Sequence, residues 1–187
     1  VHDVGKFADG FQNLRPDLLT QLQDRQVSMG YDQRHDTLGF RFLTAKGSDA
    51  TPLATLAGTQ AHEIDPGILR ELLIPWLAAA AGHHGRPPVL RIAPRPLSHH
   101  FPAGVSQDAA AFVRAAVALF PTAGAPFDLS DYERFSRAFP RVSWLTAGLA
   151  VAADWIGSNE AWFPYRAEPT PLTEYWVRHA LPQAATA

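Results

Sequence analysis

The sequence contains no cysteine, and no apolar stretch in it is long enough to cross a bilayer. The absence of cysteine excludes disulfide bonds and thiolate metal sites. A membrane-spanning helix needs about 20 consecutive apolar residues, and the nearest candidate, 144–156, carries Asp154. We therefore expect a cytoplasmic protein without a membrane span, in which histidine and carboxylate side chains provide any metal ligands.

Charged residues are also scarce, at 18% of the 187 residues, and the formal net charge is −2. This balance argues against tight binding of duplex nucleic acid by a basic surface. It leaves room for local placement of one strand by bound divalent cations and a few arginines. The hydrophobic fraction of 47% is ordinary for a globular domain with a true core.

Apolar residues recur at helical spacing along most of the chain, and no segment alternates apolar and polar residues over the length of a strand. The sequence therefore predicts an all-α fold, with residues 1–187 forming one domain. Two segments are expected to be long irregular loops, 47–63 because it is small and polar, and 86–104 because it holds five prolines. The expected helices are 1–13, 16–23, 32–46, 65–82, 106–120, one beginning at Ser130, 141–158 and 171–181.

Three of these helices begin at recognisable capping residues. Asp32 is a candidate N-cap, and Asp65 followed by Pro66 combines an N-cap with proline at the first helical position. Ser130 and Glu133 have the spacing of a capping box. These positions predict where each helix begins.

Helix 141–158 is expected to present two different faces. One face combines small residues with Asp154, which would let the backbone approach a neighbouring site closely and hold the carboxylate on a rigid element. The opposite face is expected to point into the core and carries Val142, Leu145, Leu149 and Ile156.

Four histidines and two aspartates occur in an order that suits a hydrolytic metal site. Imidazole nitrogen suits late first-row divalent metals, and carboxylate oxygen suits harder ions. A mixed set of this size can hold two ions with one carboxylate between them, as phosphodiester hydrolysis requires. The candidate ligands are His2, Asp3, His35, His83, His84 and Asp154.

The histidines also have more ordinary interpretations. Neighbouring residues on a helix point about 100° apart, so His83 and His84 can share a metal only if the backbone bends. Gly82 and Gly85 permit such a bend, whereas a helix C-terminus that favours histidine explains one of the pair well and both poorly. His35 taken alone is typical of a structural histidine.

Several other basic residues have no single assignment. The pair His99-His100 could bind metal, contact DNA or simply lie in a proline-rich loop. The arginines of that region could steer a phosphate backbone toward the site or be solvated surface. They are Arg86, Arg91 and Arg95.

In their order along the chain and in their residues, the motifs resemble the HD-domain nuclease module of the CRISPR-associated nuclease-helicase of type I systems. The paired histidines and the string from Asp154 to Asn159 are more specific than the His-Asp dipeptide, which many phosphohydrolases share. The resemblance covers nearly the whole chain. It rests on His2-Asp3-Val4-Gly5-Lys6-Phe7 with Phe11-Gln12, Arg34-His35 with Gly39, Gly82-His83-His84-Gly85, and Ala153-Asp154-Trp155-Ile156-Gly157-Ser158-Asn159 with Phe163-Pro164-Tyr165.

The resemblance implies an all-α HD-domain helical bundle that cleaves single-stranded DNA in CRISPR interference, an antiviral defence. One metal ion would be bound by His2, Asp3 and Asp154. The other would be bound by His35, His83 and His84, and Asp3 would bridge the two ions. Lys6 would lie near the scissile phosphate, and Ser158 would line the site. Two divalent ions are implied, with iron, manganese, cobalt or nickel favoured by the histidines over magnesium. The implied partners are single-stranded DNA, a helicase domain in the same or a separate chain, and the CRISPR surveillance complex.

The chain departs from this family pattern at its start, because the family has a further histidine ligand upstream of the His-Asp motif. We therefore expect residues 1–187 to be one HD nuclease domain that lacks its natural N-terminal segment and a C-terminal helicase region. The upstream ligand is then expected to lie before Val1.

Two other functions remain open from the sequence. An HD phosphohydrolase acting on a nucleotide would need a deep pocket with base-stacking aromatic residues, for which only Trp155, Trp162 and Phe163 are obvious candidates. A catalytically inactive HD interaction module would retain the fold without the chemistry, and the intact ligand set argues against it.

Overall fold

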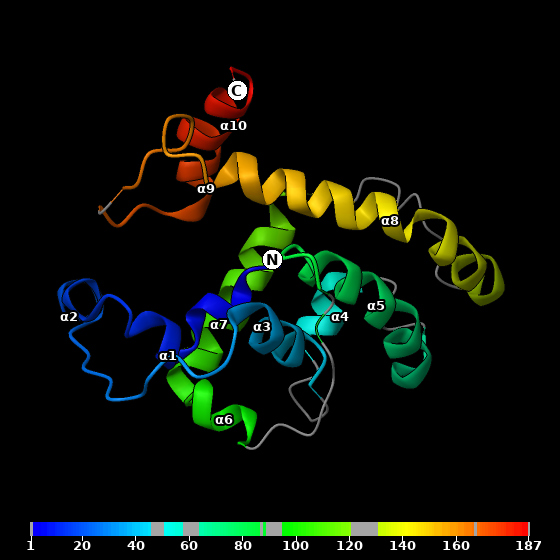
Figure 1. Cartoon of the computed structure of the whole chain (residues 1–187), viewed down its shortest axis with the longest axis horizontal. Helices are drawn as coiled ribbons and strands as arrows, with labels where there is room; N and C mark the ends of the chain where they lie inside the picture. The colour runs from blue at the N-terminus through cyan, green and yellow to red at the C-terminus, as the bar shows by residue number, and fades with distance from the viewer. Residues whose placement is uncertain are drawn as a thin grey trace.

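A computed structural model describes residues 2–45, 51–57, 64–86, 88, 95–120, 131–166 and 168–186 of the chain. These residues form helices and turns and contain no strand (Figure 1). The all-α fold predicted from the sequence is confirmed. None of the described helices is both long and apolar enough to span a membrane.

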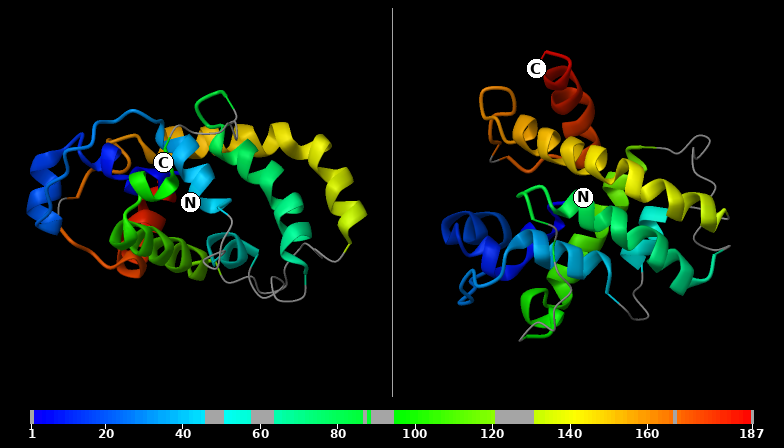
Figure 2. Two further views of the ribbon diagram at one scale, coloured as in Figure 1. Left: turned by 90° about the horizontal axis from the view of Figure 1, so that it is seen from below. Right: turned by 45° about the vertical axis from the view of Figure 1, so that its right-hand side comes forward.

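The longest helix, α8, lies along one side of the molecule and packs against α5, while the N-terminal turn packs against α3 and α7 (Figures 1 and 2). Helix α4 also contacts α7. The elements are η1, a 3-10 turn (Val4–Phe7), α1 (Asp9–Gln12), α2 (Pro16–Gln23), α3 (His35–Leu43), α4 (Thr51–Ala57), α5 (Pro66–Ala81), α6 (Leu97–His100), α7 (Ala103–Ala118), α8 (Tyr132–Gly157), α9 (Leu172–Tyr175), the π-helical turn η3 (Trp176–Ala180) and α10 (Leu181–Ala184).

Proline and aspartate begin two helices as the sequence predicts. Pro16 is the first residue of α2, and Pro66 is the first residue of α5. The Asp65 carboxylate accepts hydrogen bonds from the backbone N–H groups of Gly67 and Ile68, at 2.8 and 3.2 Å. These bonds satisfy two of the amide donors that a helix leaves free at its first turn.

Two predicted boundaries near the N-terminus are wrong. Residues 1–13 do not form one helix, because Ala8 has a ψ of 137° and separates η1 from α1. Asp32 does not cap α3, which begins at His35 without a side-chain cap. The Asp32 carboxylate instead accepts a hydrogen bond of 2.6 Å from Arg95.

The expected loops and the last long helix also differ from the sequence prediction. Helix α4 lies inside 47–63, and α6 and the start of α7 lie inside 86–104, so both segments contain helical turns. Helix α8 is one continuous element that includes Pro140, and its N-cap is Asp131, which accepts from the N–H of Arg134. The predicted cap Ser130 lies outside the described residues.

The main core forms where η1, α3 and α7 meet. Phe42 stacks on Phe101 with ring centroids 5.0 Å apart. A smaller cluster joins α5 to α8, where the Trp76 ring lies 5.4 Å from Phe135 and 5.2 Å from Phe139. The buried residues of the main core are Val4, Ala8, Leu38, Phe42, Leu43, Phe101, Val105, Ala109 and Val113.

The predicted core face of 141–158 is wrong. Leu145 and Leu149 are 64% and 62% exposed, and Ile156 is also exposed. The stripe that carries Asp154 is half-buried instead. Large aromatic contacts at the N-terminal half of α8 set its orientation on α5, and this orientation directs the small residues of the C-terminal half inward.

Two glycines allow η1 to lie directly on α3. A Cβ atom added to Gly5 would come within 1.8 Å of the His35 carbonyl oxygen and 2.6 Å of the Gly39 nitrogen. A Cβ atom on Gly39 would come within 2.9 Å of the Gly5 nitrogen. Backbone therefore touches backbone at this contact, with no space for a side chain.

We expect Gly5→Ala to lower the free energy of unfolding by at least about 1–3 kcal/mol, the usual cost of overpacking. The added methyl group meets backbone atoms, which cannot rotate away. Urea unfolding followed by circular dichroism measures this change. Gly30→Ala is the matched control, because no atom lies within 4 Å of its added Cβ. Equal stability of the two variants would contradict the close contact.

Candidate metal centre

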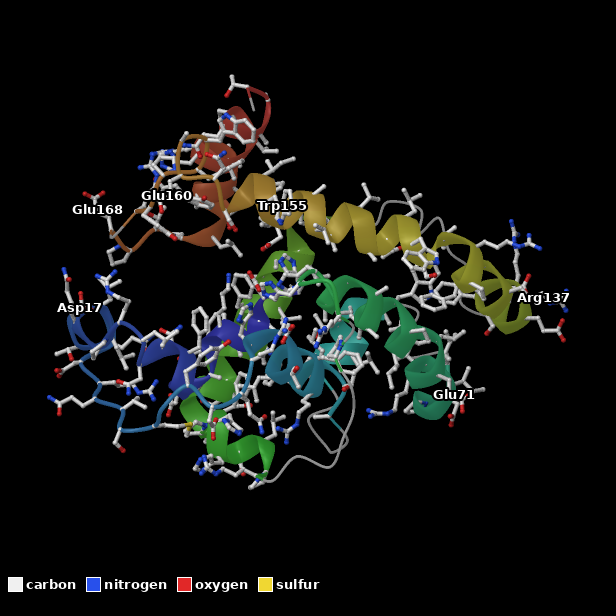
Figure 3. All side chains as sticks on the ribbon, viewed as in Figure 1. Asp17, Glu71, Arg137, Trp155, Glu160 and Glu168 are labelled. Atoms are coloured by element: carbon white, nitrogen blue, oxygen red, sulfur yellow. The ribbon has the colours of Figure 1, made fainter. Side chains whose placement is uncertain are left out.

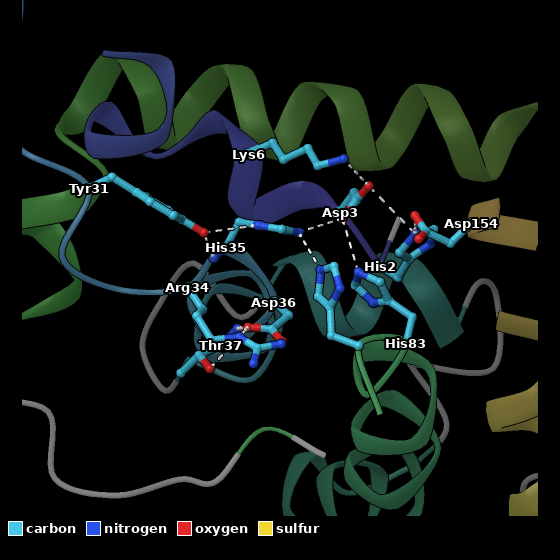
Figure 4. Close-up of polar contacts among 11 residues, drawn as sticks. His2, Asp3, Lys6, Tyr31, Arg34, His35, Asp36, Thr37, His83 and Asp154 are labelled. Carbon is cyan, nitrogen blue, oxygen red and sulfur yellow. Dashed lines mark hydrogen bonds and ion pairs between the residues drawn. The ribbon is translucent and has the colours of Figure 1, made fainter. Parts of the chain in front are cut away.

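The six predicted ligands come from four segments that meet at one end of η1, and Figure 4 labels all of them except His84. His2 and Asp3 immediately precede η1, and His35 is the first residue of α3. His83 and His84 follow the end of α5, and Asp154 lies in the last turn of α8. Segments more than 150 residues apart in the sequence therefore meet at one place.

The Asp3 carboxylate lies at the centre of this arrangement. Its Oδ1 atom is 3.2 Å from His35 Nε2 and 3.5 Å from His83 Nε2. Its Oδ2 atom is 2.6 Å from Lys6 Nζ and 3.6 Å from His2 Nε2. One oxygen thus faces two imidazoles, and the other faces a third imidazole and an ammonium group.

The remaining two ligands join the same network. Asp154 Oδ1 lies 3.6 Å from His2 Nε2, and His84 Nε2 lies 3.2 Å from His35 Nε2. The His83 ring packs between its neighbours, with its centroid 4.6 Å from that of His2 and 4.1 Å from that of His84. All six predicted side chains are therefore brought together.

Two groups of three ligand atoms are compact enough to hold an ion each. The atoms of His35, His83 and His84 all lie within 4.8 Å of one another, and so do those of His2, Asp3 and His83. His83 belongs to both groups, whereas the family resemblance places it in one. His83 is thus shared by the two groups, and Asp3, a member of the second group, lies 3.2 Å from His35 of the first.

Buried atoms without partners test whether this cluster fits metal ions. The His83 side chain is fully buried, and neither of its ring nitrogens has a hydrogen-bond partner among the described residues. His2 Nε2 and Asp3 Oδ1 are also buried without a hydrogen bond. Unsatisfied buried polar groups cost about 1–3 kcal/mol each. Divalent cations would satisfy these nitrogen and oxygen lone pairs, so the donor set fits them.

The charge states of three residues of the cluster, His2, Asp3 and His84, suit cation binding. Burial lowers the pKa of His2 more than Asp3 raises it, and burial together with His83 lowers the pKa of His84. Burial alone would raise the pKa of Asp3, but the close approach of His35 and the Lys6 ammonium holds it well below its ordinary value. Neutral imidazole and ionised carboxylate are the forms that bind metals.

A turn after α5 brings the paired histidines to the site. Helix α5 ends at Ala81, with Gly82 as its C-cap, and Gly85 has a φ of +82°. This positive φ favours glycine strongly over other residues. The chain therefore leaves helical geometry at the histidine pair, as simultaneous use of both rings requires.

Sequence reasoning missed Tyr31, which orients His35. The Tyr31 hydroxyl accepts a hydrogen bond of 3.0 Å from the His35 backbone N–H and lies 3.1 Å from His35 Nδ1. If Nδ1–H donates to that hydroxyl, the lone pair of Nε2 points toward the cluster. Tyrosine four residues before a histidine has no distinctive signal in the sequence.

An open pocket extends from the cluster. Lys6 Nζ, paired with Asp3, lies beside it, and Ser158 just past α8 lines it. Lys6 and Ser158 therefore line the same pocket as Asp3 and Asp154. Their roles in catalysis belong to the proposal below.

The second histidine pair lies elsewhere. His100 is buried in the core region, with Nδ1 4.0 Å from Asp32 Oδ1, while His99 Nε2 lies 3.4 Å from Arg95. Arg95 is paired with Asp32, Arg86 is exposed after the histidine turn, and Arg91 lies outside the described residues. None of these described residues contributes to the two groups of ligand atoms.

The all-α fold and the cluster led by the His-Asp dipeptide define an HD-domain protein. The family model described as "Cas3, HD domain" matches residues 1–163, and the chain belongs to this family. No curated protein and no solved structure matches the chain significantly. The family is one of HD nucleases of CRISPR systems.

We expect Tyr31→Phe to weaken metal binding by about 10-fold, a typical effect of removing a residue that orients a ligand. The change removes only the hydroxyl that contacts His35. Isothermal titration of the metal-free chain with Mn²⁺ measures the affinity, and Tyr175→Phe in α9 is the control. Unchanged affinity in Tyr31→Phe would show that His35 needs no such support.

Proposed function

We propose that the chain is a metal-dependent nuclease that hydrolyses phosphodiester bonds of single-stranded DNA in CRISPR interference. The observation that carries this proposal is the Asp3 carboxylate, whose two oxygens face three imidazoles and one ammonium group. Membership of the Cas3 HD family supports the reaction class.

The ligand cluster would hold two divalent ions through His2, Asp3, His35, His83, His84 and Asp154. Bound a few ångströms apart, such ions stabilise charge on the attacking and leaving oxygens of a phosphodiester. Asp3 and His83 border both groups of ligand atoms. Histidine-rich ligation favours iron, manganese, cobalt or nickel over magnesium.

Lys6 and Ser158 would contact the substrate. The Lys6 ammonium is 2.6 Å from Asp3, and its side chain is 40% exposed, so it can reach a phosphate oxygen in the pocket while remaining paired. A fixed positive charge there offsets negative charge that develops on the phosphate. The Ser158 hydroxyl can donate a hydrogen bond to the same group.

The open shape of the pocket favours a strand over a free nucleotide. Tyr165 lines the pocket and is 87% exposed, so its ring does not cover the pocket. Ligand sites for small molecules bury most of their ligand's surface. A polymer that continues beyond the pocket on both sides needs no such enclosure. A helicase domain, in the same or a separate chain, and the CRISPR surveillance complex would deliver this strand.

We expect Asp3→Asn to reduce cleavage on the order of 100-fold or more, as loss of a central charge-stabilising group does elsewhere. The change removes the negative charge that faces both groups of ligand atoms and keeps the shape of the side chain. Cleavage of end-labelled single-stranded DNA with Mn²⁺ measures the rate. Asp17→Asn is the control, because Asp17 is exposed, pairs with Arg15 and lies outside the pocket.

Full activity of Asp3→Asn would contradict the proposal. A parallel assay with free deoxynucleotides separates the two hydrolase functions. Release of phosphate from nucleotides without cleavage of DNA would favour the nucleotide phosphohydrolase.

A further inference from the structure

The pocket beside the metal centre is lined by both polar and aromatic residues. Asp3, Lys6 and Ser158 are among the polar residues, and Phe163 and Tyr165 are the aromatic ones. The more conspicuous tryptophans nearby, Trp155 and Trp162, are not part of its lining. Two aromatic rings therefore share one cavity with the groups proposed to hold the scissile phosphate.

A hydrogen-bonded turn fixes Phe163 relative to the metal centre. The Ser158 N–H donates to the Asp154 carbonyl at 2.9 Å, which continues from α8. The Asn159 carbonyl then accepts from the N–H groups of Trp162 and Phe163, at 3.0 and 2.7 Å. The Asn159 side chain accepts from Ala161 at 2.9 Å. Phe163 is thus tied through a short, rigid path to the helix that carries Asp154.

Tyr165 is almost fully exposed, so its ring can contact a ligand. Its side chain is 87% exposed, and no hydrogen bond to its hydroxyl is present among the described residues. Its ring contributes little to the fold, while its position in the pocket makes its face accessible to a ligand. Aromatic faces in nucleic-acid grooves stack on bases, and they do so with little preference for sequence.

The pocket contains charged groups of both signs, which act differently on a phosphate. Glu160 also lines the pocket and lies on the turn that leads to Phe163, beyond the end of α8 (Figure 3). The Glu160 carboxylate repels phosphate, whereas the Lys6 ammonium attracts it, so the phosphate is expected at Lys6. A strand placed this way directs its bases toward the rings.

From these observations we infer that Phe163 and Tyr165 stack on unpaired bases next to the scissile phosphate and thereby position the strand for cleavage. This inference rests on the proposed nuclease function. Bases in a duplex already have both faces covered by their neighbours, so only an unpaired base can offer its face to a ring. The two aromatic residues would therefore give the site its selectivity for single strands.

Strand binding can be measured apart from catalysis. Fluorescence anisotropy with labelled oligothymidylate in EDTA reports affinity without cleavage. We expect Tyr165→Leu to bind about 10-fold more weakly than the unchanged chain, and Tyr165→Phe to bind as well as the unchanged chain. Trp144→Leu is the matched control, because Trp144 is 86% exposed on α8 and outside the pocket. Phe163→Leu should show the same loss as Tyr165→Leu.

A strand of the same length with abasic sites distinguishes stacking from an indirect structural effect. The unchanged chain should bind it about 10-fold more weakly than oligothymidylate, and Tyr165→Leu should bind it no worse than the unchanged chain does. Wild-type affinity of Tyr165→Leu for oligothymidylate, or an equal loss on both strands, would overturn the inference.

The failure of this inference differs from the failure of the nuclease proposal. If the chain cleaves single-stranded DNA in an Asp3-dependent manner while Tyr165→Leu binds normally, the stacking role is wrong and the nuclease function stands. If the unchanged chain neither binds nor cleaves single strands, both are wrong.

Discussion

The backbone contact between Gly5 and the first turn of α3 is the constraint on which the site depends. The Gly5 Cα lies against the His35 carbonyl and the Gly39 amide, where no side chain fits. This contact places Asp3, two residues earlier, within 3.2 Å of His35. A larger residue at either glycine would push η1 away from α3 and thereby move Asp3 away from His35. The packing of η1 on α3 and α7 then serves to hold this contact.

The electrostatics of the cluster make metal binding and stability interdependent. Four imidazoles and two carboxylates are crowded together, and several of their buried nitrogens and oxygens lack hydrogen-bond partners among the described residues. Lys6 neutralises part of the negative charge of Asp3. Bound cations would offset the rest of the desolvation cost. Ion binding is therefore coupled to the free energy of folding.

The sequence predicts the helices, and which side chains meet at the cluster, better than it predicts their surroundings. Asp65 with Pro66 marks the start of α5 because capping depends on a few neighbouring residues. The buried face of α8 was predicted wrongly because the contact of Phe135 and Phe139 with Trp76, far away in sequence, sets its orientation. The role of Tyr31 could not be predicted from the sequence for a related reason. Its hydroxyl contacts His35 only once the turn before α3 has folded. The central position of His83 likewise depends on the conformation of one turn.

Anomalous X-ray diffraction from crystals grown with Mn²⁺ would test the metal centre most directly. We predict two anomalous peaks, each with ligand bonds of about 2.0–2.3 Å. One peak should lie beside His35, His83 and His84, and the other beside His2, Asp3 and Asp154. Peaks located away from Asp3, for example at His99 and His100, would contradict it. So would a structure of the metal-soaked protein in which the Asp3 carboxylate contacts no ion.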